Sequence, residues 1–358
     1  MNTILLDGVI TPDDSSPLAT APMRPENEAD LKGKYSEGGK DIARLPRMRI
    51  ATSGGFAYTP YCPAAAIRRA LRNAARNYTA QINGQKWGLD VHRYLTIGGV
   101  KGSDKEGIIN PAETEILRQR LPIISLFGAS SDLGNPWVAG KLAVSHAIPD
   151  EPIAPTIITG VRSDPIKRDT SEIQYLDDET VASYKTIAAN EREYTTLNRE
   201  LKELNTKAKI SRNDEYQGRI AELENLLQEL RKSVNSDVSV GMPLAGYEVI
   251  PPGVPLKQNI RLTNATTEEI GLLFKALKGF ACHPVLGAHY AQGCGFVKCR
   301  WTVKKLNTNT ASYETIGTLS ITPLEGLMMS DAVTAFAMEC ETALEAAIGQ
   351  GHVQEALS

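Results

Sequence analysis

Acidic residues are missing from one long stretch of a chain that is otherwise slightly acidic. The 358-residue sequence has a formal net charge of -3, yet it contains no Asp or Glu in the 48 residues from Ile42 to Leu89. Eight positive side chains lie in the same stretch: Arg44, Arg47, Arg49, Arg68, Arg69, Arg72, Arg76 and Lys86. A local positive field within a nearly neutral protein indicates a binding site for a polyanion.

Other absences exclude whole classes of protein. No apolar run approaches the roughly 18 residues of a membrane span, and no secretory leader opens the sequence, so we expect a cytoplasmic protein without membrane contact. The 5 cysteines are an odd number spread along the chain, which argues against a disulfide framework and favours reduced thiols. An apolar content of 42% is ample for a packed core.

A basic helix is predicted from Pro63 to Tyr78. Pro63 suits the first turn of a helix, and an alanine-rich segment follows it. Arg68, Arg72 and Arg76 recur at i, i+4 and i+8, so they share one face of this helix. Like charges at this spacing repel, and no acid lies nearby in the sequence to pair with them. A solvated outer face is the alternative interpretation.

A strand or hairpin, broken at Gly54 and Gly55, is predicted over residues 47–58, directly before the basic helix. The arginines of this region alternate with four aromatic residues: Phe56, Tyr58, Tyr61 and Tyr78. Arginine beside aromatic side chains is the composition that proteins use to bind single-stranded RNA, although Tyr and Phe are also ordinary strand residues.

A long helical hairpin is predicted between about Asp178 and Val234. Apolar residues step by 3 and 4 from Tyr194 to Ala208, and the same pattern resumes from Tyr216 to Val234 after a polar turn. Two heptad seams joined by a short turn predict an antiparallel coiled-coil hairpin. It could be a solvated arm or an arm that contacts a partner.

The remaining segments alternate between strands and helices. Short apolar runs fill residues 79–150, strands flank a Pro-Pro-Gly turn after Gly246, a helix follows Thr266 or Thr267, and a strand carries Lys298 and Arg300. A further strand and a terminal helix close the chain. This order predicts an α+β fold with a ferredoxin-like (RRM-like) core and insertions.

Three further groups carry weaker signals for chemistry. The glycine-rich turn GAHYAQGCG matches no phosphate-loop fingerprint and is better explained by a backbone or an RNA that passes close to it. Histidines and cysteines cluster between Cys282 and Cys299, but no C-x-x-C pair is present, so we expect buried thiols and no metal or other cofactor. Asp41, beside the basic stretch, could orient a 2′-hydroxyl or hold a metal for strand scission, or it could simply pair with Lys40 or Arg44.

Several of these segments, taken in order, resemble the repeat-associated mysterious protein (RAMP) superfamily of CRISPR systems. They are the glycine-broken strand, the Pro63 helix, LPIISLFGAS, GYEVIPPGVPL, and a helix followed by GAHYAQGCGFV. Within that superfamily the likeness is to Cas7-like backbone subunits of effector complexes. The LFG and GKLAVS elements are most similar to the type IV subunit.

The resemblance implies a palm of residues 1–157 and 241–358, interrupted by a thumb-like insertion of residues 158–240 that holds the helical hairpin. Such subunits polymerise along a guide RNA and contact its backbone, because the bases must pair with a target. The implied partners are the CRISPR guide RNA, further copies of the chain, other effector subunits and the target nucleic acid. The implied RNA-binding residues are Arg47, Arg49, Gly54, Gly55, Arg68, Arg69, Arg72, Arg76, Arg162, Lys167, Arg168, Lys298 and Arg300.

Two departures from the family pattern matter for function. The thumb region holds a helical hairpin where many relatives have a β-hairpin. Related type III subunits cut target RNA with an acid before the basic helix, and only Asp41 occupies a comparable place, without the surrounding pattern. We therefore expect no catalysis. The alternatives are a metal-dependent endoribonuclease that uses Asp41, and a coiled-coil adaptor that binds no nucleic acid.

Overall fold

The computed structural model describes residues 2–20, 34–37, 40–84, 86–99, 111–130, 132, 137–159, 170–210, 214–234, 245–348 and 353. The chain divides into two compact units. The first unit comprises Met1–Ile158 and Gly246–Ser358, and the second unit comprises Thr159–Ala245.

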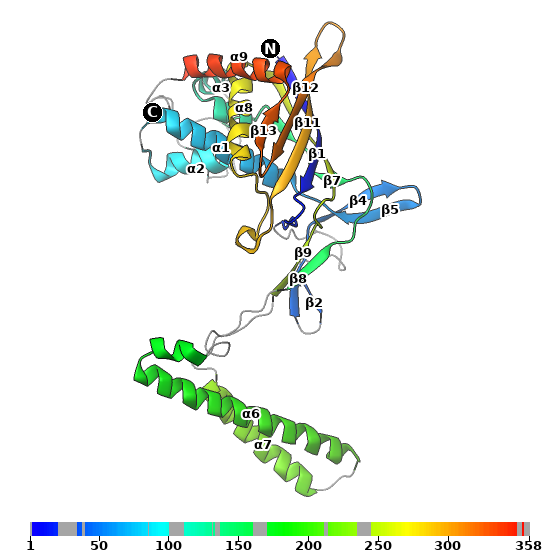
Figure 1. The fold of residues 1–358 in the computed structure, drawn as a ribbon, viewed down its shortest axis with the longest axis vertical. Coiled ribbons are helices and arrows are strands. Elements are labelled where there is room, and N and C mark those ends of the chain that lie inside the picture. Colours follow the sequence, from blue (N-terminus) through cyan, green and yellow to red (C-terminus); the bar gives the residue numbers. More distant parts are fainter. Residues whose placement is uncertain are drawn as a thin grey trace. The chain divides into compact units, whose positions relative to one another are not determined.

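An antiparallel sheet forms the centre of the first unit (Figure 1). Its strands lie in the order β13 (Gly326–Met329), β12 (Ser312–Thr322), β11 (Val297–Asn307), β1 (Asn2–Pro12), β10 (Leu256–Ala265) and β6 (Leu142–Val144), and β7 (Ile148–Pro149) also pairs with β10. On β10 and β11, buried and more exposed residues alternate, because one face of the sheet packs on helices and the other does not.

Three helices pack on the buried face of this sheet: α1 (Ala64–Asn83), α8 (Thr267–Ala281) and α9 (Asp331–Ala347). A capping box starts α8, in which Thr266 and Glu269 satisfy each other's backbone N–H groups. Gly271 allows α8 to approach α9 closely, since a Cβ there would lie 2.3 Å from the carbonyl oxygen of Cys340.

The central elements follow one another as strand, helix, two strands, helix and strand: β1, α1, β6, β10, α8 and β11. The prediction of an α+β protein is confirmed, and the strand pairs of the main sheet are antiparallel. The predicted basic helix is also present, although α1 continues beyond Tyr78 to Asn83 and ends at Gly84 in the left-handed conformation.

Two insertions enlarge this core. Between β1 and α1 lie β2 (Lys34–Glu37), β3 (Lys40–Ala43) and a hairpin of β4 (Arg47–Thr52) and β5 (Gly55–Pro60). β2 and β3 join β9 (Ala245–Val249) and β8 (Thr156–Thr159) in a second sheet. Between α1 and β6 lie three short helices, α2 (Leu89–Ile97), α3 (Pro111–Arg120) and α4 (Pro122–Phe127).

Two helices make up most of the second unit, α6 (Asp178–Ile210) and α7 (Asp214–Val234), and they pack along each other. Leu223 and Leu227 of the predicted seam are buried, and Arg219 of α7 forms an ion pair with Glu200 of α6 at 3.4 Å. Within the described parts of both units, no helix has the length and apolar character needed to cross a membrane.

Candidate nucleic-acid interface

The β4–β5 hairpin carries an exposed face of cationic and aromatic residues. Arg49 pairs with Tyr58 across the strands, and Ala51 pairs with Phe56, so these four side chains point to the same side. All four are exposed, and Phe56 keeps 70% of its surface in solvent. The Arg49 guanidinium lies 4.8 Å from the centroid of the Phe56 ring, within cation–π distance. We call Arg49, Ala51, Phe56 and Tyr58 the hairpin face.

Arg47 belongs to the base of the same hairpin but has a different role. Its guanidinium forms a 2.9 Å ion pair with Glu248 of β9, a carboxylate that is 4% exposed. The other carboxylate oxygen of Glu248 accepts a hydrogen bond from the backbone N–H of Leu45. Arg47 therefore anchors the hairpin to β9. Because its charge is already paired with Glu248, Arg47 is a weaker candidate for phosphate binding than the sequence indicated.

The turn of the hairpin contains both predicted glycines. Gly55 has a φ of +131°, which a side chain would strain, whereas a Cβ at Gly54 would meet no atom within 4 Å. Both glycines are exposed at the tip, where a backbone could approach closely.

The start of α1 is capped by a histidine from a distant segment. Pro63 offers no side-chain acceptor, and the backbone N–H of Ala64 donates instead to Nδ1 of His146 at 2.9 Å. The His146 ring also packs edge-on against Tyr61. This contact fixes α1 relative to the segment that follows β6.

Arg72 is buried, not displayed to solvent. It is 7% exposed, and its guanidinium donates to the carbonyl oxygens of Tyr94 and Leu95 at the end of α2 and of Phe127 at the end of α4. These carbonyls lie at the C-terminal ends of α2 and α4, where helices run out of backbone donors. The Tyr94 oxygen also accepts from the backbone N–H of Gly98 and the Phe127 oxygen from Arg68, so Arg72 adds hydrogen bonds to two helix C-termini. Burial, with a smaller effect of neighbouring Arg68, lowers the pKa of Arg72 to about 10, which still leaves it charged at neutral pH. In this structure Arg72 therefore bonds to backbone carbonyls, and its predicted contact with phosphate stays a prediction.

Arg68 shares this structural role in part. It donates to the carbonyl oxygens of Leu142 and Phe127 at 2.6 and 2.5 Å, and burial lowers its pKa. Arg68 and Arg72 lie on one face of α1, as predicted. No acidic side chain near them in the sequence pairs with them, and their guanidinium groups donate to backbone carbonyl oxygens instead. Arg76 is partly buried and bonds to Thr96 and Asn77, whereas Arg69 points to solvent.

The LFG element (residues 126–128) and the GKLAVS element (residues 140–145) pack against each other, and both lie next to α1. Gly128 has a φ of +66°, and a Cβ there would lie 2.6 Å from the carbonyl oxygen of Val138 and 2.7 Å from the backbone nitrogen of Gly140. Lys141 and Ser125 both bond to Glu269, a carboxylate that is 3% exposed and also caps α8. These motif residues therefore hold α4, β6 and α8 together.

Two lysines on the solvent face of the main sheet are paired with acids. Lys298 pairs with Asp14 at 2.6 Å and Asp13 at 3.2 Å, and Lys304 pairs with Asp7 at 2.9 Å. Arg300 is exposed and is the better-placed of the two basic residues predicted on β11.

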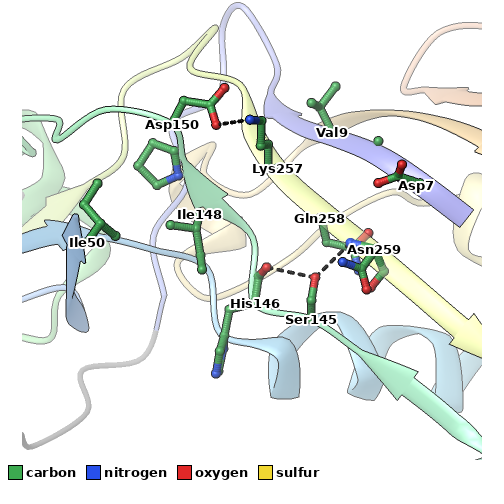
Figure 2. A pocket seen from close by; sticks show the side chains of 12 residues that line it. Asp7, Val9, Ile50, Ser145, His146, Ile148, Asp150, Lys257, Gln258 and Asn259 are labelled. Carbon is green, nitrogen blue, oxygen red and sulfur yellow. Dashed lines mark hydrogen bonds and ion pairs between the residues drawn. The ribbon is translucent and has the colours of Figure 1, made fainter. Parts of the chain in front are cut away.

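A cleft of about 560 Å³ separates this sheet face from the hairpin (Figure 2). Ile50 of β4 lines one side, and Val9 and Asn259 line the sheet side. Lys257 reaches Asp150 at 2.6 Å across its edge. Its lining contains two acids, Asp7 and Asp150, and one lysine, so the cleft lacks the excess positive charge of a phosphate site.

The glycine-rich turn is held by aromatic contacts. The rings of His289 and Tyr247 are stacked with centroids 3.9 Å apart, and the Tyr247 hydroxyl lies 3.7 Å from the Cys294 sulfur. Burial and Cys294 raise the pKa of Tyr247 to about 12. Four cysteines are buried and only Cys282 is exposed, as expected of ordinary thiols. The described residues contain no group of three or more potential metal ligands.

The described part of the structure does not include the side chains of four predicted site residues. Arg162, Lys167 and Arg168 lie outside the described residues, and for Asp41 only the backbone, in β3, is described. Three residues that hold the site together were not predicted from the sequence: Glu248, which pairs with Arg47; Glu269, which caps α8 and binds Lys141; and His146, which caps α1. Glu269 could have been found from its position three residues after Thr266, the capping-box spacing. No local signal marks the other two, whose partners are distant in sequence.

Comparisons with known proteins identify the family. A model of the RAMP superfamily matches residues 50–298. A chain of a solved structure described as "Type IV-B CRISPR Complex" is similar with a TM-score of 0.41 and 16% sequence identity, covering 86% of this chain and 91% of that one. No curated protein matches. Because the family model spans more than half of the sequence, this protein belongs to the RAMP superfamily.

Proposed function

We propose that this protein is a non-catalytic, guide-RNA-binding subunit of a CRISPR effector complex, most like the type IV backbone subunit, and that its copies polymerise along the RNA. Membership of the RAMP superfamily supports the class. The likeness of the LFG and GKLAVS elements supports the subtype.

In this proposal the first unit is the palm. Its central strands lie in the order β11, β1, β10, β6, the fourth, first, third and second strands of a ferredoxin-like βαββαβ motif. The second unit is the thumb-like insertion, and its two helices form the coiled-coil arm. Arg162, Lys167 and Arg168, which precede that arm in the sequence, stay proposed RNA contacts.

The observation that carries the RNA contact is the hairpin face. An arginine and two aromatic rings lie side by side in solvent within the acid-free stretch. Arginine pairs with phosphate, and aromatic rings stack on bases of any sequence, so this combination suits single-stranded RNA. Arg69, Gly54 and Gly55 would extend the contact, and Arg300 stays a further candidate.

Purification from the native host tests the proposal. We expect RNA to co-purify with the wild-type protein, with a high ratio of absorbance at 260 nm to that at 280 nm, and sequencing should recover guide-like repeats. The double variant Arg49→Glu/Phe56→Ala should lose this RNA. If the wild-type protein carries no RNA and the helical hairpin instead retains a protein partner, the adaptor alternative is correct.

Incubation of the assembled complex with labelled complementary RNA and Mg²⁺ tests the absence of catalysis. We expect the RNA to stay intact. Periodic cuts that disappear in Asp41→Ala would instead establish the endonuclease alternative.

A further inference from the structure

A basic cleft lies between the end of α1 and the start of α2. Its volume is about 680 Å³, within the range of pockets that hold small molecules. Among its described lining residues, the charged or titratable side chains are Arg76, Lys86 and His92, and none is acidic. Asp90, the acid nearest to them in the sequence, is exposed and does not line the cleft. The charge of the cleft therefore suits an anion.

Arg76 is held in place at one side of this cleft. It is partly buried, and its guanidinium donates to Thr96 Oγ1 at 3.1 Å and to Asn77 Oδ1 at 2.6 Å. Among the described residues these bonds use two of the five N–H donors of a guanidinium, so the others can reach a phosphate. Asn77 accepts through its oxygen, and its amide N–H groups can donate to a ligand. Lys86, in the loop between the two helices, adds an exposed second cation.

An indole ring distinguishes the cleft from a plain phosphate site. Trp87 lines the cleft, and it is only partly exposed because it also packs against the main core. Leu89 lines the same cleft and keeps 61% of its surface in solvent. A nucleotide consists of a flat base and a phosphate, and proteins bind these by stacking on aromatic rings and by contacts with cations. The cleft offers both kinds of contact.

The cleft is remote from the hairpin face. α1 starts just after β5, the cleft lies at the other end of α1, and a helix of 20 residues is about 30 Å long. α2 and the β4–β5 hairpin accordingly lie well apart within the first unit (Figure 1). One nucleotide cannot contact both sites, so a ligand in the cleft is distinct from the nucleotides proposed at the hairpin face.

We propose that this cleft binds a single nucleotide, with its phosphate between Arg76 and Lys86 and its base against Trp87. A free nucleotide and the phosphorylated end of a strand present the same two groups, and both fit this description. The site does not rest on the proposed guide-RNA function, which uses the hairpin face.

Calorimetric titration of the full-length protein, purified free of RNA, with 5′-AMP tests this site. We expect 5′-AMP to bind at least about tenfold more tightly than ribose 5-phosphate, which lacks the base, and than adenosine, which lacks the phosphate. Binding should also quench tryptophan fluorescence, and most of this quenching should disappear in Trp87→Phe. Equal binding of 5′-AMP and ribose 5-phosphate, or no binding of 5′-AMP at millimolar concentration, would overturn the proposal.

Substitutions in the cleft test the named contacts. Arg76→Gln/Lys86→Gln should weaken binding of 5′-AMP at least about tenfold, because two partners of the phosphate are lost. Lys86→Gln alone, at an exposed position where misfolding is not expected, should weaken it several-fold. Arg93→Gln is the matched control, since Arg93 is exposed on α2 outside the cleft lining. Wild-type affinity in the double variant would contradict the proposal.

Two further titrations identify the source of the nucleotide and separate this site from the RNA interface. A 5′-phosphorylated dinucleotide should bind as tightly as 5′-AMP if the cleft receives the end of a strand, and much more weakly if it receives a free nucleotide. The Arg49→Glu/Phe56→Ala variant should still bind 5′-AMP while losing RNA, which separates failure of this site from failure of the RNA-binding function.

Discussion

Individual arginines of the acid-free stretch perform different tasks that their spacing does not reveal. Arg72 and Arg68 satisfy backbone carbonyls, Arg47 pairs with Glu248, and Arg49 and Arg69 face solvent. Arginine is suited to all of these tasks, because its five N–H donors fit carbonyls, carboxylates and phosphates alike. The same residue type therefore indicates an RNA contact only where the structure leaves it exposed.

Replacement of Arg72 by methionine tests its structural role. Arg72→Met keeps an apolar stem but removes three hydrogen bonds that a buried charged group donates to backbone carbonyls, so we expect the free energy of unfolding to fall by about 3 kcal/mol in urea denaturation. Arg69→Met, at an exposed position, should change it by no more than about 0.5 kcal/mol. A stable Arg72→Met protein that loses RNA would show that Arg72 contacts phosphate after all.

Substitution of alanine for Gly128 and for Gly54 tests the close packing of the LFG element, with Gly54 as the control. Gly128→Ala forces a Cβ against Val138 and Gly140 at a positive φ, so we expect a loss of about 3 kcal/mol of stability by thermal or urea unfolding. Gly54→Ala meets open space and should cost less than about 1 kcal/mol. Equal stability of the two variants would mean that the LFG and GKLAVS elements do not pack as described.

At the scale of elements, the sequence predicted those helices and strands that depend on local patterns of residues. The Gly54/Gly55 hairpin, the helix after Pro63 and the helices of residues 178–234 all follow from turn residues, caps and periodicity, which act over a few residues. The partners of Arg47 and the cap of α1 depend on Glu248 and His146, which only the tertiary fold brings near. Single-sequence patterns cannot show such contacts.

The helical hairpin should behave as an element with its own stability. Leu223→Ala removes a fully buried side chain of the seam, so we expect a local loss of about 3 kcal/mol. Hydrogen exchange of α6 and α7 amides should become faster by about tenfold or more, whereas amides of the main sheet should be unaffected. Asn225→Ala, at an exposed position of α7, is the control. Faster exchange throughout both units would show that they unfold together.

At the scale of the whole molecule, the proposed RNA contact and the helical arm belong to different units. The first unit displays the hairpin face, and the second unit consists mostly of α6 and α7. Because Lys298 and Lys304 of the main sheet are paired with acids, the hairpin face is the best-supported RNA contact.

The most direct test is the affinity of the full-length protein for single-stranded RNA, measured over a range of salt concentrations. We predict that Arg49→Glu/Phe56→Ala weakens binding at least about tenfold and lowers the salt slope by about one, because a phosphate contact and a stacked base are lost. Arg199→Glu, which reverses a highly exposed arginine on α6, should bind like the wild type. Wild-type affinity and salt slope in the hairpin variant would contradict the proposed RNA interface.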